Sequence, residues 1–301
     1  MKYIIGVDGG GTKTALEAVG TDGSERKVTF GALNYNFIGI DAALSHIRDG
    51  LSAMEIVPEN VSAIAVGDPA IDDYPVGDAS LAFLHRLEAM LPNAAVYIRS
   101  DAYMALYSLT RGASGAAVIA GTGAMGIAED DSGNVLFSGG WGRLTADEGG
   151  GFYIGTRAVR AALRYADGID PPTILLDALL DFCGCRSPRQ LIEAFYGNPP
   201  FAPASFASAV AQCAENGDAA ALEILKDAAW RLYEMADSLL RKCGFTNRVI
   251  PVGTVGSVIR KNPIVRAEFE RLMLAAYPLA EIRESDISPE HAAVLYAQAR
   301  L

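Results

Sequence analysis

This 301-residue chain contains three glycine-rich turns. The residue types and spacing of these turns are the ones best suited to binding a ligand. The first is residues 8–14 (DGGGTKT), the second is residues 121–123 (GTG), and the third is residues 253–257 (GTVGS). Each follows a short apolar run typical of a buried strand. Glycines at a strand end let the backbone approach a ligand and present N–H groups to an anion. Because α/β folds collect ligands at strand ends, the three turns together predict a phosphate site.

Carboxylates lie close to these turns in the sequence. Asp8 ends the first expected strand, Asp101 follows the strand expected near residues 95–100, and Asp147 and Glu148 follow the glycine-rich residues 139–142. Phosphoryl transfer requires one carboxylate to hold Mg²⁺ and another to orient and deprotonate the attacking hydroxyl. The alternative for Asp101 is a helix cap, a common role for an aspartate that follows a strand.

Two familiar nucleotide motifs fit these turns poorly. Gly6 and Gly11 have the opening spacing of a Walker A loop, but Thr12 stands where that loop needs lysine. Residues 121–126 (GTGAMG) match the spacing of a dinucleotide fingerprint. In a dinucleotide site that fingerprint lies at the start of a helix, whereas the residues that follow it here have the pattern of a β-hairpin. The sequence therefore favours two hairpins that bind a polyphosphate from both sides, rather than an NAD site.

The elements that position these residues form two similar halves. Hydrophobic periodicity and turn residues predict the order βββαβαβα in the first half, with strands near residues 3–7, 15–19, 27–30, 61–66 and 95–99 and helices from about 41, 80 and 101. The second half repeats the opening, with strands near 116–120, 125–128 and 135–137, then a helical stretch that includes a helix from Asp218 to Gly244, a strand at 248–252 and a last helix near 289–300. Corresponding glycine turns lie 110 residues apart, which indicates an internal repeat. We expect lobes over residues 1–112 and 113–301, with the last helix able to pack back on the first lobe.

Composition excludes several classes of protein. Half of the residues are hydrophobic, which excludes intrinsic disorder, and the formal net charge is −11. An acidic chain without a basic stripe is not expected to bind nucleic acid. No apolar run is long enough to span a bilayer and no signal peptide is evident, so we expect no membrane association and a cytoplasmic protein. The four cysteines suit reduced thiols.

In their order along the chain, the motifs resemble the N-acetylglucosamine kinase branch of the BadF/BadG/BcrA/BcrD ATPase family. The segments that carry the resemblance are residues 8–14, 100–102 (SDA), 120–123 (AGTG), 139–142 (GGWG) with 147–149 (DEG), and 251–257 (PVGTVGS). The resemblance implies a duplicated α/β fold of the ribonuclease H-like type, shared by sugar kinases, Hsp70 and actin. It also implies ATP- and Mg²⁺-dependent phosphorylation of an amino sugar, in the first place N-acetylglucosamine at its 6-hydroxyl, by a homodimer.

The resemblance further implies a role for individual residues. Asp8 would organise Mg²⁺, and the nucleotide would be held by Gly10, Gly11, Thr12, Lys13, Gly121, Thr122, Gly123, Gly253 and Gly256. Asp101 would be the base that takes the proton from the sugar, and the sugar would contact Asn34, Asp101, Gly140, Trp141 and Asp147. Closure of the two lobes would expel water and bring Asp101 to the hydroxyl.

The sequence departs from the family pattern at small residues next to these positions. Ala124 replaces a serine, Ala146 and Gly150 replace a glycine and a serine around the acidic pair, and His291 stands where the family has a glycine. The acids themselves are kept. Phosphoryl transfer therefore stays the expectation, while glucosamine, N-acetylmuramic acid or another hexose remains open as the acceptor.

Two other functions stay open. Some relatives are ATPases that drive electrons into dehydratases or reductases through an iron–sulfur cluster, which requires cysteines beside the nucleotide turns. Here the cysteines lie in the expected helical region, at positions 183, 185, 213 and 243. A noncatalytic sugar sensor is the second alternative, but a DNA-binding helix-turn-helix is not expected before the first strand. The three histidines are assigned to packing or to the surface.

Overall fold

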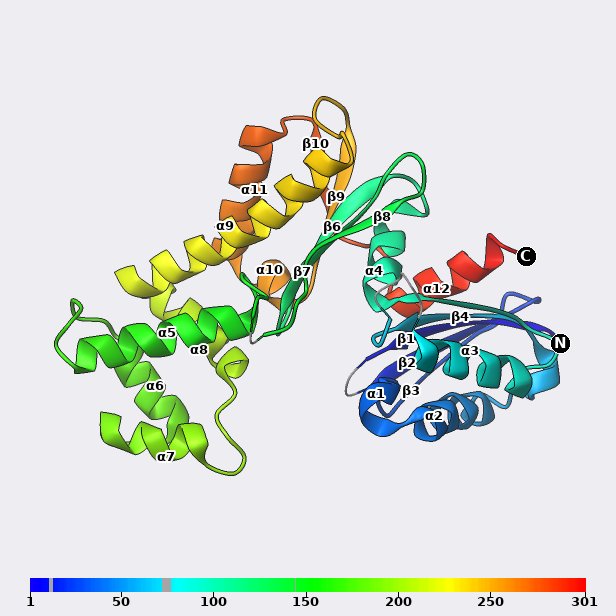
Figure 1. Cartoon of the computed structure of the whole chain (residues 1–301), viewed down its shortest axis with the longest axis horizontal. Helices are drawn as coiled ribbons and strands as arrows, with labels where there is room; N and C mark the ends of the chain where they lie inside the picture. Colours follow the sequence, from blue (N-terminus) through cyan, green and yellow to red (C-terminus); the bar gives the residue numbers. More distant parts are fainter. Residues whose placement is uncertain (11–12, 72–76, 144) are drawn as a thin grey trace. The chain divides into compact units, whose positions relative to one another are not determined.

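The computed structural model describes residues 1–10, 13–71, 77–143 and 145–301, and it divides into two compact units (Figure 1). The first unit comprises Met1–Ala113 with Ser285–Leu301, and the second comprises Ser114–Glu284. The C-terminal segment therefore belongs with the N-terminal residues, whereas a boundary at residue 112 alone would assign it to the second lobe. Gly11 and Thr12, which the sequence analysis assigns to the nucleotide, lie outside the described residues.

A five-stranded mixed sheet forms the centre of the first unit. Its strand order is β3-β2-β1-β4-β5, with bounds Glu25–Phe30, Thr14–Gly20, Tyr3–Gly9, Val61–Asp68 and Ala95–Ser100. The first three strands form an antiparallel meander, and β4 and β5 run parallel to β1. The helices of this unit are α1 (Tyr35–Ile38), α2 (Ile40–Ala53), α3 (Asp78–Met90), α4 (Asp101–Thr110) and α12 (Pro289–Gln298), with a 3-10 turn at Pro58–Asn60.

Helix α12 packs directly on strand β1, which explains why the last residues join the first unit. Gly6 makes this possible, because a Cβ built there would lie 2.0 Å from the carbonyl oxygen of Glu290. The first turn of α12 is also tied to β2: His291 Nδ1 lies 2.7 Å from Oε1 of Glu17, a fully buried side chain. Lys27 Nζ lies 2.9 Å from the other oxygen of Glu17. A buried charge of this kind requires paired, hydrogen-bonding neighbours.

The second unit repeats the same sheet topology. Its strand order is β10-β9-β6-β7-β8, with bounds Ala280–Arg283, Ile250–Val255, Gly115–Ala120, Ala124–Glu129 and Val135–Gly139. Again an antiparallel meander is followed by two strands parallel to its first strand. The helices are α5 (Gly151–Ala166), α6 (Leu175–Cys183), α7 (Leu191–Tyr196), α8 (Pro203–Glu215), α9 (Ala219–Lys242), α10 (Ser257–Lys261) and α11 (Pro263–Ala276), with a 3-10 turn at Pro188–Gln190. The duplicated α/β architecture predicted from the sequence is confirmed.

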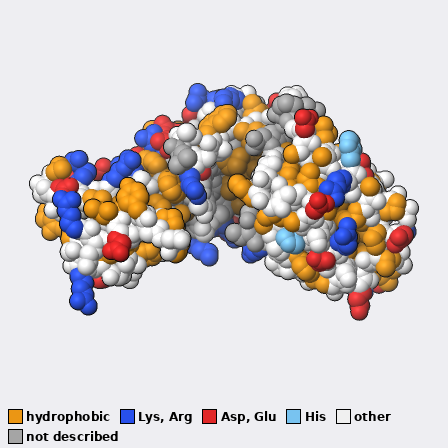
Figure 2. All heavy atoms as spheres, turned by 60° about the horizontal axis from the view of Figure 1, so that its bottom comes forward, with side chains coloured by type: hydrophobic (Ala, Val, Ile, Leu, Met, Phe, Trp, Pro, Cys, Tyr) orange, Lys and Arg blue, Asp and Glu red, His pale blue; other side chains and the backbone are white. Residues whose placement is uncertain are grey.

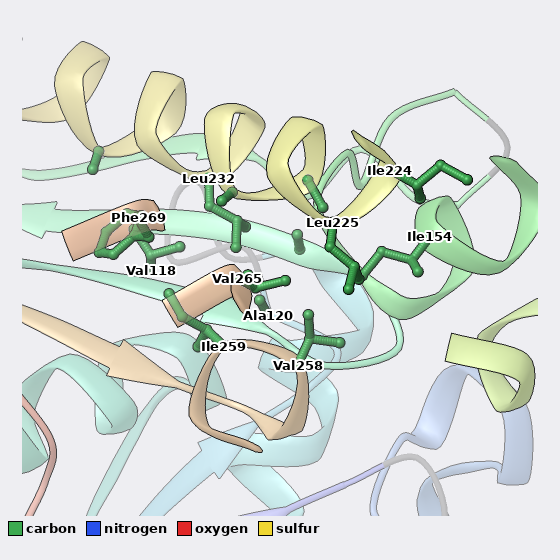
Figure 3. Packing of buried hydrophobic residues seen from close by; sticks show 14 of the residues in the cluster. Val118, Ala120, Ile154, Ile224, Leu225, Leu232, Val258, Ile259, Val265 and Phe269 are labelled. Atoms are coloured by element: carbon green, nitrogen blue, oxygen red, sulfur yellow. The ribbon is translucent and has the colours of Figure 1, made fainter. Parts of the chain in front are cut away.

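The core of the second unit lies between this sheet and its helices. Figure 3 shows side chains of α9 and α11, among them Leu232 and Phe269, converging on Val118 and Ala120 of β6. Helix α9 begins where the sequence predicts, because the side chain of Asp218 accepts a hydrogen bond from the backbone N–H of Ala221 at 2.8 Å. Full burial of one large apolar side chain stabilises a fold by about 1.5–3 kcal/mol. The packed sheet gives a rigid base for the turns at its strand ends.

The surface carries both signs of charge. On the face drawn in Figure 2, Lys, Arg, Asp and Glu side chains are scattered between apolar ones. All four cysteines are free thiols. Within the described ranges, we find no helix of the length and apolarity that crossing a membrane requires.

Candidate active site

The carboxyl ends of three parallel strands bring three aspartates to one edge of the first sheet. Asp8 near the end of β1 pairs in register with Gly67 of β4, and Asp68 ends β4 opposite Ser100 of β5. Asp101 follows Ser100 directly. The sequence analysis identified Asp8 and Asp101. It missed Asp68, whose signal is the same: an acid that ends a run of apolar strand residues.

The electrostatics of this edge favour a bound cation. The pKa of Asp8 is raised to about 7, chiefly by burial and further by the negative charges of Asp101 and Glu290, against the opposing charge of Lys13. These effects place the carboxylates of Asp101 and Glu290 within electrostatic range of Asp8. A divalent cation would relieve the repulsion, because it favours the ionised form of each acid.

Asp101 lies at the start of helix α4. Ser100 is the N-cap, and its Oγ accepts a hydrogen bond from the backbone N–H of Tyr103 at 3.0 Å. The cap position is therefore occupied by Ser100, and the carboxylate of Asp101 is exposed and accepts from the N–H of Ala102 at 2.7 Å. The exposed carboxylate of Asp101 therefore lies at the strand-end edge of the first sheet.

Asn34 and Asp68 hold the loop that follows the meander. Asn34 Oδ1 accepts a hydrogen bond from the N–H of Asn36 at 3.2 Å and so caps helix α1. Tyr35 donates its hydroxyl hydrogen to Asp68 Oδ2 at 2.7 Å, and its oxygen lies 2.6 Å from Ser80 Oγ. The capping bond uses only the amide oxygen of Asn34. Its Nδ2 group is the part that could contact a sugar.

In the second unit, residues 121–123 form the tight turn between β6 and β7. The N–H of Gly121 donates to the carbonyl of Gly123 at 2.9 Å. Carbonyl groups of Gly121 and Thr122 accept from Gly151 and Phe152, the first two residues of helix α5, at 2.8 and 2.9 Å. The turn is thus fixed against the N-terminus of a 16-residue helix. Such a helix end favours an anion beside the turn.

Asp147 lies against this same turn. A Cβ built on Gly123 would meet Asp147 Oδ2 at 2.3 Å, and Asp147 Oδ1 accepts a hydrogen bond from the N–H of Gly142 at 3.2 Å. Burial raises the pKa of Asp147, and the N–H of Gly142 partly opposes this. Gly150 approaches the turn from the other side, because a Cβ there would lie 2.5 Å from the carbonyl carbon of Gly123. The structure therefore places the segment that carries Gly140 and Asp147 against the 121–123 turn.

The tip of that segment is open to solvent. Trp141 is 81% exposed, and the adjacent Gly140 and Gly142 have φ angles of +74° and +90°. Asp147 also has a positive φ, +63°, a conformation in which aspartate is several times more frequent than most other residue types. The side chain of Trp141 is therefore accessible to a ligand or partner.

A cavity of about 370 Å³ lies on the helical side of the 121–123 turn. Its walls come from the turn, α5, α8 and α10, and include Thr122, Ile154, Ser208, Val258, Lys261 and Asn262. The Oδ1 atom of Asn262 is used as the cap of α11, accepting from Ile264 and Val265. A mostly apolar wall beside a phosphate-type turn suits a nucleoside. The sequence analysis missed these wall residues, because they lie on helices far apart in the chain.

Gly253 and Gly256 differ in what they contribute to this cavity. The sequence analysis placed both in a turn after a strand ending at residue 252. That placement of Gly253 is wrong: β9 continues to Val255, because Gly253 pairs with Ala117 of β6 within the sheet. Gly256 does form the turn, at a φ of +96°, and a Cβ there would lie 2.4 Å from the carbonyl oxygen of Ala120. Gly256 thus lets α10 begin close to the phosphate turn.

The residues of the first unit fit a magnesium ion that is coordinated mainly by substrate phosphates and water. Mg²⁺ is usually bound by one or two carboxylates together with water and substrate phosphates. Asp8 is a partly buried carboxylate next to further negative charge, which agrees with this pattern. Within the described part of the chain, no group of three or more His, Cys, Asp or Glu side chains is arranged to hold a metal by itself.

Comparison with known proteins agrees with the geometry. A sequence model of the BadF/BadG/BcrA/BcrD ATPase family matches residues 5–297. The chain is 30% identical to the N-acetylmuramic acid/N-acetylglucosamine kinase of Clostridium acetobutylicum, over 99% of each chain. It is 31% identical to the N-acetyl-D-glucosamine kinase of Dictyostelium discoideum, over 98% of each chain. A crystal structure of a ROK family glucokinase from Streptomyces griseus, in complex with glucose and AMPPNP, shares the fold with a TM-score of 0.61 at 14% identity, over 99% of this chain and 98% of that one.

Proposed function

Because the chain belongs to the BadF/BadG/BcrA/BcrD ATPase family, we propose that it is an ATP-dependent sugar kinase. The proposed reaction transfers the γ-phosphoryl group of ATP to a hydroxyl of an amino sugar, in the first place the 6-hydroxyl of N-acetylglucosamine. Two relatives that align over almost their whole length carry kinase names with this sugar. Glucosamine and N-acetylmuramic acid are the alternative acceptors.

The observation that carries this proposal is the pair of aspartates at the strand ends of the first unit. Asp8 is partly buried and feels the negative charge of Asp101, while Asp101 is exposed at a helix N-terminus. Phosphoryl transfer to an alcohol needs two carboxylates. One binds a cation, and the other is accessible to the substrate hydroxyl. In the proposed reaction, Asp101 accepts the hydroxyl proton as the oxygen attacks the γ-phosphorus.

Nucleotide binding is proposed to use both glycine turns. The first turn, with Gly10 and Lys13, and the second turn, with Thr122 and Gly123, would offer backbone N–H groups to phosphate oxygens. Gly121, whose N–H donates to the carbonyl of Gly123, would shape the second turn. The cavity beyond Gly256 would hold the nucleoside, whose base would contact the apolar wall. Asp8 would hold the Mg²⁺, which when bound neutralises charge on the transferring phosphoryl group.

Acceptor recognition is proposed to use the residues that the resemblance assigns to the sugar. The hydroxyl groups would donate hydrogen bonds to Asp147 and Asp101, and Asn34 Nδ2 would donate to a sugar oxygen. Trp141 would contact the apolar face of the ring. The contact of Asp147 with Gly123 supports this assignment, because it keeps the sugar segment next to the phosphate turn. We further propose that the enzyme acts in the cytoplasm as a homodimer, which analytical ultracentrifugation would test.

The test is acceptor-dependent ADP release across a panel of hexoses and amino sugars, with the site of phosphorylation read by NMR. The proposal predicts highest turnover with an N-acetylated amino sugar and phosphate on the 6-oxygen. Chelation of divalent cations should abolish turnover, and added Mg²⁺ should restore it. If no sugar in the panel increases ADP release, the proposal is wrong.

A further inference from the structure

The backbone on the N-terminal side of Asn34 is anchored within the first unit. The carbonyl of Gly31 accepts a hydrogen bond from Thr14 Oγ1 at 2.7 Å, and the N–H of Leu33 donates to the carbonyl of Gly10 at 3.0 Å. Leu33 is fully buried, whereas Asn34 is partly exposed. The chain that leads into Asn34 is therefore tied to strand β2 and to the first glycine turn.

On the C-terminal side of Asn34, the anchor is the side chain of Tyr35. Tyr35 is 4% exposed, and its ring stacks on that of Phe83 of α3, with the ring centres 4.9 Å apart. The tyrosine oxygen lies 2.7 Å from Asp68 Oδ2 and 2.6 Å from Ser80 Oγ. Because a carboxylate can only accept, the tyrosine hydroxyl donates to Asp68 and the hydroxyl of Ser80 donates to the tyrosine. This one side chain links α1 to the end of β4 and to α3.

Helix α1 depends on this anchor. It has four residues, fewer than an isolated helix needs to persist in water, and Asn34 is its N-cap. Asp68 is fully buried, and its other oxygen, Oδ1, accepts a hydrogen bond from the N–H of Ala70 at 2.8 Å. A buried carboxylate requires such donors, so the contact between Tyr35 and Asp68 is favourable for both partners. Loss of the tyrosine hydroxyl would loosen Tyr35 and, with it, the adjacent backbone of Asn34.

We propose that Tyr35 is a positioning residue for acceptor binding, which acts through Asn34 and makes no contact with the sugar itself. Its hydrogen bonds with Asp68 and Ser80 fix the backbone at Asn34, so that Asn34 Nδ2 is held in one place to donate to a sugar oxygen. This inference rests on the proposed sugar kinase function and adds a residue outside the substrate contacts. Positioning matters because a displacement of about 1 Å is enough to weaken the action of a binding group strongly.

The experiment measures kcat and the KM values for N-acetylglucosamine and ATP in Tyr35→Phe, in Asn34→Ala and in the double variant. We expect Tyr35→Phe to raise KM for the sugar by about tenfold, the effect of losing a hydrogen bond to a charged group. It should change kcat and KM for ATP by less than about twofold, because ground-state binding of the sugar is what it weakens. In the Asn34→Ala background, Tyr35→Phe should change KM for the sugar by less than about twofold, since the residue through which it acts is gone.

Tyr97→Phe is the matched control. Tyr97 also lies in the first unit, and its hydroxyl donates to the carbonyl of Arg300 at 2.9 Å, so this variant loses a tyrosine hydrogen bond elsewhere and should keep both KM values. Ser80→Ala removes one of the two hydrogen bonds of Tyr35 and keeps the other, so it should raise KM for the sugar by a smaller factor, about three- to fivefold. If thermal unfolding shows that Tyr35→Phe does not fold, Ser80→Ala with and without Asn34→Ala provides the same comparison.

Two results would overturn the inference. The first is an unchanged KM for the sugar in Tyr35→Phe, and the second is a rise in KM of equal size with and without the side chain of Asn34. Failure of the proposed kinase function gives a different result, since the wild type would then phosphorylate no acceptor. In that case calorimetric titration with N-acetylglucosamine decides. A loss of affinity in Tyr35→Phe that disappears in the Asn34→Ala background supports the inference, whereas equal losses in both backgrounds, or a wild type that binds no sugar, contradict it.

Discussion

At the scale of single residues, a substitution at Asp101 distinguishes phosphoryl transfer from nucleotide binding. Asp101→Asn removes the proton acceptor and keeps the shape of the side chain, so kcat should fall by about 10²–10⁴-fold while ATP binding is retained. Asp78→Asn is the matched control, since Asp78 is also an exposed acid at the first position of a helix in the same unit. Equal turnover of the two variants in a steady-state assay would remove Asp101 from the role of base.

The glycines around the second turn give a second prediction at this scale. In Gly123→Ala the atoms nearest the added Cβ belong to the side chain of Asp147, which can rotate away, so KM for the sugar should rise several-fold with little change in melting temperature. Gly150→Ala meets the backbone of Gly123 and should cost about 1–3 kcal/mol of stability. Thermal unfolding and sugar kinetics on both variants test this. A stability loss of similar size in the two would contradict the described contact with Asp147.

Residue types and spacing single out Asp8, Asp101, Asp147 and the glycine turns in the sequence alone, and the roles assigned to them stay predictions. Types and spacing suffice because glycine turns and acids at strand ends are local features of the sequence. Asp68 was missed, although it ends a strand in the same way as Asp8. The wall of the nucleoside cavity was not predictable, because Ser208 and Lys261 meet only through the tertiary packing of α8 and α10.

At the scale of elements, the attachment of α12 to the first sheet depends on the absence of a side chain at Gly6. Gly6→Ala would push the helix from β1, and we expect a loss of at least about 1–3 kcal/mol in the free energy of unfolding. Gly77→Ala, where an added Cβ meets nothing within 4 Å, should change stability by less than about 1 kcal/mol. Urea unfolding measures both. A Gly6→Ala protein as stable as the wild type would rule out the close packing.

The buried Glu17 also gives the first sheet a pH dependence, because it pairs β2 with Lys27 of β3. Its carboxylate raises the pKa of Lys27, so the pair stabilises the fold below the ordinary lysine pKa of about 10.4. This contribution is lost as the pH rises through the higher pKa of the folded state. Unfolding free energies measured from pH 8 to strongly alkaline pH should fall more steeply in the wild type than in Lys27→Met or Glu17→Gln. Parallel curves for all three proteins would contradict the prediction.

The order of elements along the first half could be read from apolar runs and turn residues, because the alternation of buried and exposed positions is local. In the second half the same signals located four strands and missed β10. Prediction from the sequence was weaker for elements whose bounds depend on tertiary contacts. β9 extends through Gly253 because a neighbouring strand pairs with it, and no local signal marks that pairing. Helices α6, α7 and α8 were predicted only as an undivided helical stretch.

At the scale of the whole molecule, the proposed kinase consumes ATP only when a sugar accepts the phosphoryl group. The alternative within the same family is an ATPase that hydrolyses ATP without such an acceptor. Composition and fold do not distinguish the two, whereas the stoichiometry of the reaction does.

The most direct test is therefore the ratio of ADP to sugar phosphate, measured with purified protein, Mg²⁺ and ATP in the presence and absence of N-acetylated amino sugar. The account predicts one ADP for each sugar phosphate and negligible ADP without the sugar. ADP formed at the same rate without any acceptor, and no phosphorylated sugar, would contradict it.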